Sequence, residues 1–233
     1  MSTHARSGEP FFFWMAVLLI AIVVSGFSVL AFSRPGGPLE TPVYLHFHGA
    51  VFLGWYVLLA VQARLIGAGQ AALHKRMGLA SLALALAIVV VGYFVVRFAL
   101  LKPGKMIAGR PAIMGCVFPV WDIIDFTIAY ALGFAARANS AVHKRFMLSA
   151  AILMIDPAMA RLILTPGFPG SLIMVFETAL FGAMIGYDLI RLQWPHWASV
   201  FGLGLYAAAM TFKSNVEGFG WWPGFIQSLF ALG

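Results

Sequence analysis

The sequence predicts an all-α, polytopic membrane protein, a helical bundle with about seven transmembrane helices and a short C-terminal interfacial helix. Composition supports this fold class. Of the 233 residues, 62% are hydrophobic and only 10% are charged, whereas a soluble domain carries roughly 25% charged residues. The mean hydropathy is +0.93. The polar side chains are too few to cover the surface of a protein of this length in water. We therefore expect the lipid bilayer to cover much of that surface.

Long apolar segments are the second observation. A helix needs about 20 apolar residues to cross the hydrocarbon, and the sequence predicts spans at 11–32, 44–66, 77–101, 112–134, 146–165, 171–192 and 197–213. The first segment is longer than a signal-peptide core and is followed by further spans, so we expect it to be retained. No stretch between the spans is long enough for a soluble domain, and we therefore expect one membrane domain over 1–233.

The C-terminal tail differs from the spans. Residues 219–232 are apolar but too short to cross the bilayer, and they include Trp221 and Trp222. Tryptophan is enriched where a membrane meets water. We therefore expect this tail to form the interfacial helix.

Lysine and arginine residues predict the orientation, because cytoplasmic loops carry more of them. With a cytoplasmic N-terminus, eight cations lie inside and five outside. The inner set is Arg6, Arg64, Lys75, Arg76, Arg137, Lys144, Arg145 and Arg191, and the outer set is Arg34, Lys102, Lys105, Arg110 and Lys213. We expect a multi-pass protein of the cell inner membrane whose C-terminus lies outside. No basic run is interleaved with aromatic residues outside the spans, so we expect no nucleic-acid partner.

An internal repeat stands out in the middle of the chain. Residues 72–81 and 141–150 each carry a His-Lys-Arg triplet after an inner loop and at the start of a span. The unit of helix, inner loop, triplet and helix therefore occurs twice. We predict a pseudo-repeated core at about 44–165 in which His74 and His143 share one depth near the inner side.

With these motifs the sequence resembles an uncharacterised bacterial family of predicted multi-pass membrane proteins with paired His-Arg motifs. The matching residues, within about 44–165, are His74-Lys75-Arg76 with Gly78, His143-Lys144-Arg145 with Phe146-Met147, and Arg161. The resemblance implies a four-helix core with haem-binding potential, distantly similar to the small b-type membrane cytochromes. It implies no known reaction, and this chain has Lys where the family usually has Arg.

The expected cofactor is haem b, with His74 and His143 as axial ligands and His48 as the candidate for a second site. The positive end of a helix dipole disfavours protonation of a histidine that begins a helix, and haem iron binds neutral imidazole. The flanking Lys-Arg pairs are candidates to hold haem propionates or lipid phosphates. A simpler interpretation is that both triplets are anchors at the inner membrane surface.

Span two carries a polar stripe. His48, Trp55 and Gln62 are spaced seven apart, so at 3.6 residues per turn they share one helix face, which we expect to point into the bundle. His46 and His48 are two apart and point to nearly opposite sides. They therefore cannot bind one ion together on a regular helix.

Ionisable residues at membrane depth are costly and indicate either paired charges or a functional site. Asp122 and Asp125 are three apart on one helix face, and Arg97 and Arg161 are the expected partners. These residues predict a structural ion-pair network, a proton relay, or a weak metal site formed with His48. The rest of the network is Asp156, which precedes a helix-bending proline, and Glu177 on span six.

Three functions of different classes follow. The first is a haem-binding redox protein of electron transport, or a factor that handles haem during assembly. The second is a proton-coupled transporter that uses the Asp, Arg and Glu network. The third is a non-catalytic accessory subunit that packs on other membrane subunits through its small residues. No motif identifies an enzyme, and a membrane hydrolase with metal at His48, Asp122 and Asp125 is the weakest alternative.

Overall fold

The computed structural model describes residues 9–33 and 37–232, whose regular elements are all helices except for one hairpin of two short strands. The long helices are α1 (Pro10–Ser33), α2 (Val43–Gly67), α3 (Ala71–Leu100), α5 (Val117–Ala135), α6 (Ser140–Leu153), α8 (Ser171–Leu192) and α9 (Trp197–Asn215). The shorter elements are η1 (Gly37–Glu40), the antiparallel strands β1 (Met106–Ile107) and β2 (Arg110–Pro111), α4 (Ala112–Gly115), α7 (Asp156–Leu164), η2 (Val216–Gly218) and α10 (Trp222–Leu229).

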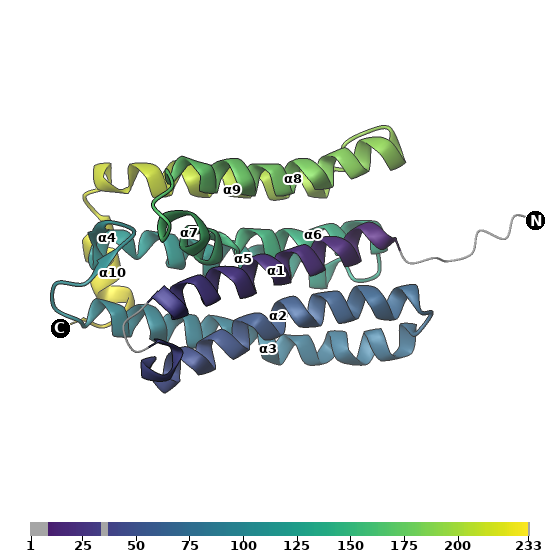
Figure 1. Cartoon of the computed structure of the whole chain (residues 1–233). Coiled ribbons are helices and arrows are strands. Elements are labelled where there is room, and N and C mark those ends of the chain that lie inside the picture. The colour runs from purple at the N-terminus through teal and green to yellow at the C-terminus, as the bar shows by residue number, and fades with distance from the viewer. Residues whose placement is uncertain (1–8, 34–36, 233) are drawn as a thin grey trace, which may run out of the picture.

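The long helices lie side by side in one bundle (Figure 1). The helices α2 and α3 form one side, α8 and α9 form the other, and α1, α5 and α6 lie between them. The most extensive packing joins α5 to α6, α1 to α2, and α2 to α3. The described chain begins at one end of the bundle and finishes at the other, where α4 and α10 lie. We call these the amino end and the carboxyl end.

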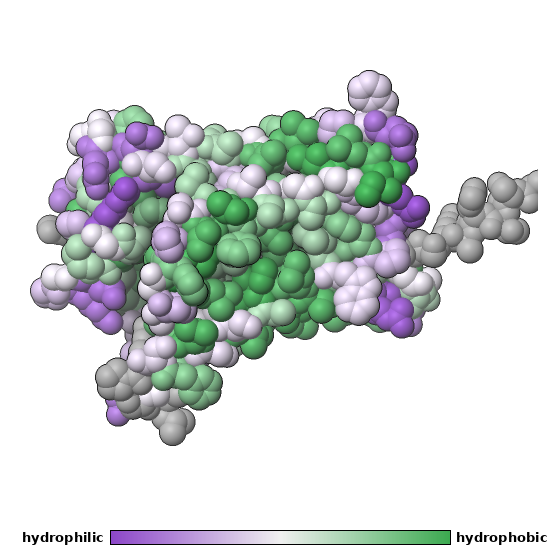
Figure 2. Space-filling model, turned by 45° about the horizontal axis from the view of Figure 1, so that its top comes forward, coloured by the Kyte–Doolittle hydropathy of each residue, from purple (hydrophilic) through white to green (hydrophobic). Residues whose placement is uncertain are grey.

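The bundle surface has an apolar belt between two more polar ends (Figure 2). Large hydrophobic side chains such as Ile190, Leu79 and Leu86 are exposed on it. In water so large an apolar surface would associate or aggregate, so a bilayer is the environment that fits it. The protein is therefore an integral membrane protein that crosses the bilayer several times.

Five helices are long and apolar enough to cross a membrane, and the bent pair α6 and α7 makes a sixth if it counts as one span. These helices confirm the first six spans expected from the sequence as helical segments. The seventh, α9, is 19 residues long but is not among the candidates, because Lys213 and several small polar residues lower its hydropathy. The seven-span count stays a prediction.

The predicted bend at Asp156-Pro157 is confirmed. The helix breaks between Leu153 and Asp156, and α6 and α7 meet at 40°. Proline at the first turn of α7 costs no hydrogen bond there, but it cannot continue a helix from α6. The backbone of α7 at Ala158 lies against Gly26 of α1, where any side chain would collide with the Ala158 carbonyl. Glycine therefore lets α1 pack directly over the break.

Candidate functional site

A buried lysine lies among carboxyl groups in the half of the bundle near the carboxyl end. Lys213 of α9 is 3% exposed. Its Nζ lies 2.5 Å from Asp122 Oδ1 of α5 and donates to Asp156 Oδ2 of α7 at 3.1 Å. Side chains of a helix tilt toward its N-terminus, so a lysine in the last turn of α9 extends back into the bundle.

Two more carboxyl groups complete this site. Asp125 of α5 and Glu177 of α8 are both buried and within electrostatic reach of Lys213. Asp122 Oδ2 and Glu177 Oε1 are buried without a hydrogen-bond partner in the described part of the chain. We call Lys213, Asp122, Asp125, Asp156 and Glu177 the carboxylate–lysine cluster.

Lys213 pairs with two of the aspartates of this cluster. The sequence placed Lys213 at the outer surface and named Arg97 and Arg161 as partners of the aspartates. Arg97 instead donates from Nε to the Phe230 carbonyl at 3.1 Å. Arg161 donates to the Pro157 carbonyl and lies 4.5 Å from the centre of the Phe27 ring. One signal could have pointed to Lys213: the predicted spans hold more carboxyl groups than arginines.

The stripe on α2 faces inward as predicted, while His46 on the same helix is exposed. Three polar atoms of the stripe, His48 Nδ1, Trp55 Nε1 and Gln62 Oε1, are buried, with no hydrogen bond to any described residue. The His48 ring lies 4.2 Å from the Phe52 ring. Within 9–33 and 37–232, no three His, Cys, Asp or Glu side chains are grouped to hold a metal ion. The structure therefore does not join His48 with Asp122 and Asp125 in such a group.

The two repeat histidines meet at the amino end, as the repeat predicts. The ring centres of His74 and His143 are 6.2 Å apart. The His143 Nδ1 hydrogen-bonds the Gly133 carbonyl at 2.7 Å. Since a carbonyl only accepts, Nδ1 carries a proton, and in the neutral ring this tautomer would leave the Nε2 lone pair free, as in many metal-binding histidines. His74 Nδ1 is buried and forms no hydrogen bond with the residues described.

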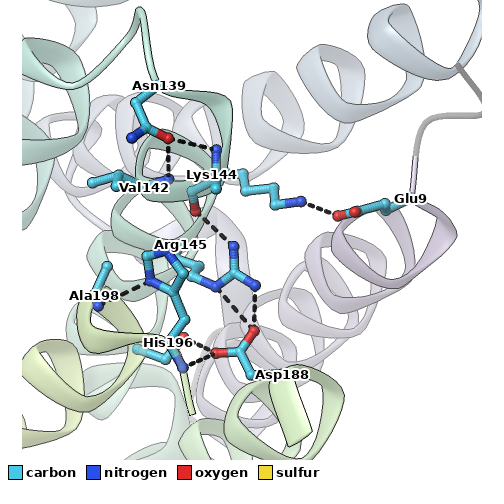
Figure 3. Close-up of polar contacts among 10 residues, drawn as sticks. Glu9, Asn139, Val142, Lys144, Arg145, Asp188, His196 and Ala198 are labelled. Carbon is cyan, nitrogen blue, oxygen red and sulfur yellow. Dashed lines mark hydrogen bonds and ion pairs between the residues drawn. The ribbon is translucent and has the colours of Figure 1, made fainter. Parts of the chain in front are cut away.

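Both cations beside His143 form ion pairs with carboxylates (Figure 3). Lys144 pairs with Glu9. Arg145 is buried and pairs with Asp188 through Nε, at 2.9 Å, and Nη2. The expectation that the second Lys-Arg pair holds propionates or lipid phosphates is therefore wrong for Arg145, because burial keeps it from both. Lys75 and Arg76 of the first motif are exposed.

Each nitrogen of the Arg145 guanidinium and each carboxylate oxygen of Asp188 makes at least one hydrogen bond. Arg145 Nη1 donates to the Ala141 carbonyl at 2.7 Å. Asp188 Oδ2 accepts from the backbone N–H of His196 at 3.2 Å and from Ser199 Oγ at 2.6 Å. These bonds join α6, α8 and the start of α9. A buried pair with all its groups satisfied is what a structural link requires.

Comparison with known proteins adds no assignment. The chain matches no family model, no curated protein and no solved structure. The resemblance to membrane proteins with paired His-Arg motifs therefore stays a prediction based on the two triplets.

Proposed function

We propose that the protein is a proton-coupled membrane transporter and that the carboxylate–lysine cluster is its proton-binding site. The observation that carries the proposal is that the Lys213 ammonium of α9 pairs with two buried carboxylates, Asp122 of α5 and Asp156 of α7, while two further buried carboxyl groups, Asp125 and Glu177, lie within its electrostatic reach. If all were ionised, three negative charges would be uncompensated. Each charge at membrane depth costs roughly 3 kcal/mol or more. Carboxyl groups in such a set share protons, and can take them up or release them when their surroundings change.

The backbone at the cluster has a break that could act as a hinge in such a transporter. Asp156 is the first residue of α7, at the 40° break after α6. Transporters often place ion sites at broken helices, since the break acts as a joint and leaves polar backbone groups near the site. A change in the bend would move Asp156 relative to Lys213 on α9. Protonation and conformation are therefore coupled through this one contact.

The two buried ionic sites differ in a way that favours this assignment. Asp188 accepts hydrogen bonds at both carboxylate oxygens. In the carboxylate–lysine cluster, Asp122 and Glu177 each have an oxygen without a described partner. A complete set of bonds resists change, whereas an incomplete set can exchange partners with little cost.

Proton flux tests the proposal. The purified protein is reconstituted into liposomes that contain a pH-sensitive dye, and proton entry is driven by an imposed membrane potential. We expect Asp122→Asn and Asp156→Asn to lower the entry rate by about tenfold or more, because amides cannot take up a proton. The infrared band of protonated carboxyl groups should weaken in the same variants.

The matched control is Glu40→Gln, since Glu40 is exposed in η1 and outside the cluster. It should keep the wild-type rate. The proposal is wrong if folded Asn variants conduct protons like the wild type, or if the wild-type protein moves none and shows no protonated carboxyl band.

A second candidate function is haem binding at His74 and His143, favoured by their 6.2 Å ring separation and by the bond from His143 to Gly133. When bound, haem supplies one-electron redox chemistry. His143 would bind through Nε2, while the Gly133 carbonyl holds its ring in place. Lys75 and Arg76 are the exposed cations of the first motif for the propionates.

The spectrum of the purified protein tests this candidate. We expect a Soret band and, after reduction, a b-type alpha band that His143→Ala and His74→Ala abolish. His46→Ala, which changes an exposed histidine, should leave both bands in place. A protein that stays colourless after haem is added during expression would exclude the candidate.

We also propose the orientation predicted from the loops, with the amino end in the cytoplasm and the carboxyl end outside the inner membrane. Arg6 and Arg34 of the two cation sets lie outside the described residues. Arg145 of the inner set and Lys213 of the outer set are buried in the bundle, so neither counts as a cation at a membrane surface. The excess of cations at the amino end is therefore unchanged.

A further inference from the structure

The carboxyl end of the bundle is closed above the carboxylate–lysine cluster. The Lys213 backbone carbonyl accepts a bond from Arg110 Nη1 at 2.9 Å, and Arg110 Nε lies 3.3 Å from Glu217. The charged groups of Arg110 and Lys213 lie 5.7 and 5.8 Å from the centre of the Phe118 ring. An aromatic ring and an ion pair thus separate the cluster from this end.

Helix α10 lies at the same end of the bundle, next to α4 (Figure 1), and contacts the last turns of α3. It has eight residues, or about 12 Å at 1.5 Å per residue, and so cannot cross the membrane. Its inner side chains pack in one apolar group, which we call the end cluster: Val96, Cys116, Val117, Val120, Val216, Trp222, Ile226 and Phe230. The Trp222 Nε1 donates to the Ile113 carbonyl at 2.9 Å.

The intramembrane arginine of α3 hydrogen-bonds the end of α10. Arg97 Nε donates to the carbonyl of Phe230, the C-cap of α10. The last carbonyls of a helix have no partner within it and carry partial negative charge, so a cation is favoured there. Tyr93, one turn before Arg97, stacks on Phe230 with ring centres 4.8 Å apart. Both residues therefore fix the last turn of α10.

The other side of α10 is partly exposed, although the Trp221 ring contacts Phe212 of α9. Trp221, Phe225 and Leu229 are between 43% and 55% exposed, an apolar surface that suits the membrane interface. A helix of two turns is not stable by itself. The position of α10 thus depends on its contacts in the end cluster and on these hydrogen bonds.

We propose that α10 is a closing helix that seals the carboxyl end above the carboxylate–lysine cluster, with Arg97 as its positioning residue. Its displacement opens the cluster to that side of the membrane. The evidence that α10 closes this end is its contacts with the bundle. Only the role of this closure in controlling proton access rests on the proposed function.

Cys116 provides a natural reporter, because it is the one cysteine of the chain and is 0% exposed beneath α10. A membrane-impermeant maleimide is applied to intact cells and to inverted vesicles that contain the full-length protein. We expect little labelling of the wild type. Arg97→Gln and Trp222→Ala should label about tenfold faster or more, and from one side only, since opening exposes a thiol that was buried.

Trp221→Ala is the matched control, because it removes the exposed neighbour of the buried Trp222. It should stay at the wild-type rate, and Arg97→Lys should recover part of the protection. Folding of each variant is checked by gel filtration in detergent. The proposal is overturned if the folded Arg97→Gln and Trp222→Ala variants stay protected, or if Trp221→Ala labels as fast as they do. Labelling does not require transport, so its outcome is independent of the proton-flux result.

Discussion

Single residues show two ways of keeping charge inside this bundle. Arg145 and Asp188 form a pair in which both carboxylate oxygens accept hydrogen bonds. Lys213 instead shares its ammonium between Asp122 and Asp156, with Asp125 and Glu177 close by. The first arrangement neutralises one charge with one charge, and the second leaves an excess of carboxyl groups. That difference separates a structural link from a site that can exchange protons.

The structural role of Asp188 can be measured. Replacing Asp188 with Asn leaves Arg145 buried without a counter-charge, and we expect a loss of about 3–5 kcal/mol of unfolding free energy. Lys144→Gln breaks the partly exposed pair with Glu9 and should cost about 1 kcal/mol or less. Thermal unfolding in detergent compares the two. Equal melting temperatures for the two variants would show that the Arg145–Asp188 pair does not hold α6, α8 and α9 together.

At the scale of elements, the break between α6 and α7 determines where the cluster forms. Asp156 lies in the first turn of α7, where a negative charge is favoured by the partial positive charge of the helix N-terminus. The close approach of α1 at Gly26 holds α7 from the other side. The bend therefore directs the Asp156 carboxylate into the bundle, and no additional loop is needed to place it there.

The start of α9 should be sensitive to pH. The His196 Nδ1 accepts a bond from the Ala198 N–H at 3.1 Å and so must be unprotonated. Burial, and then the charge of Arg145, lower the pKa of His196 below 6.5, against an opposing effect of Asp188. The unfolded chain therefore binds this proton more readily. The stabilisation is complete above about pH 6.5 and is lost as the pH falls through the lowered pKa.

Melting curves of the wild type and His196→Asn over this pH range test the effect. Asn caps a helix at any pH, so the variant should lose less stability on acidification, by less than about 1 kcal/mol. The partial exposure of His196 keeps the difference small. Parallel pH profiles for both proteins would contradict a cap that depends on a neutral His196.

At the scale of the whole molecule, the polar sites lie at different depths of an otherwise apolar body. The histidine pair and the Arg145–Asp188 pair lie toward the amino end, and the carboxylate–lysine cluster lies toward the carboxyl end under α10. Between them the main apolar core fills the bundle, with Phe126, Leu148 and Phe181 fully buried. A proton that crosses the molecule would therefore use groups of different helices at each level.

The sequence by itself determined the helical segments and which of their faces carry polar residues. Hydropathy and helical period are local properties, so the spans, the inward stripe on α2 and the bend at Pro157 could be predicted from them. The repeated triplet placed His74 and His143 at one level because each follows a similar inner loop.

Only the tertiary structure decided which polar groups meet. Lys213 lies 91 residues from Asp122 and 57 from Asp156 along the chain, and Arg97 lies 133 residues from Phe230. In a bilayer the lipid is as apolar as the helix surfaces, so hydropathy does not say which helix becomes a neighbour. The direction of one lysine side chain then settled whether a charge lies at the surface or in the core, and that depends on the helices packed around it.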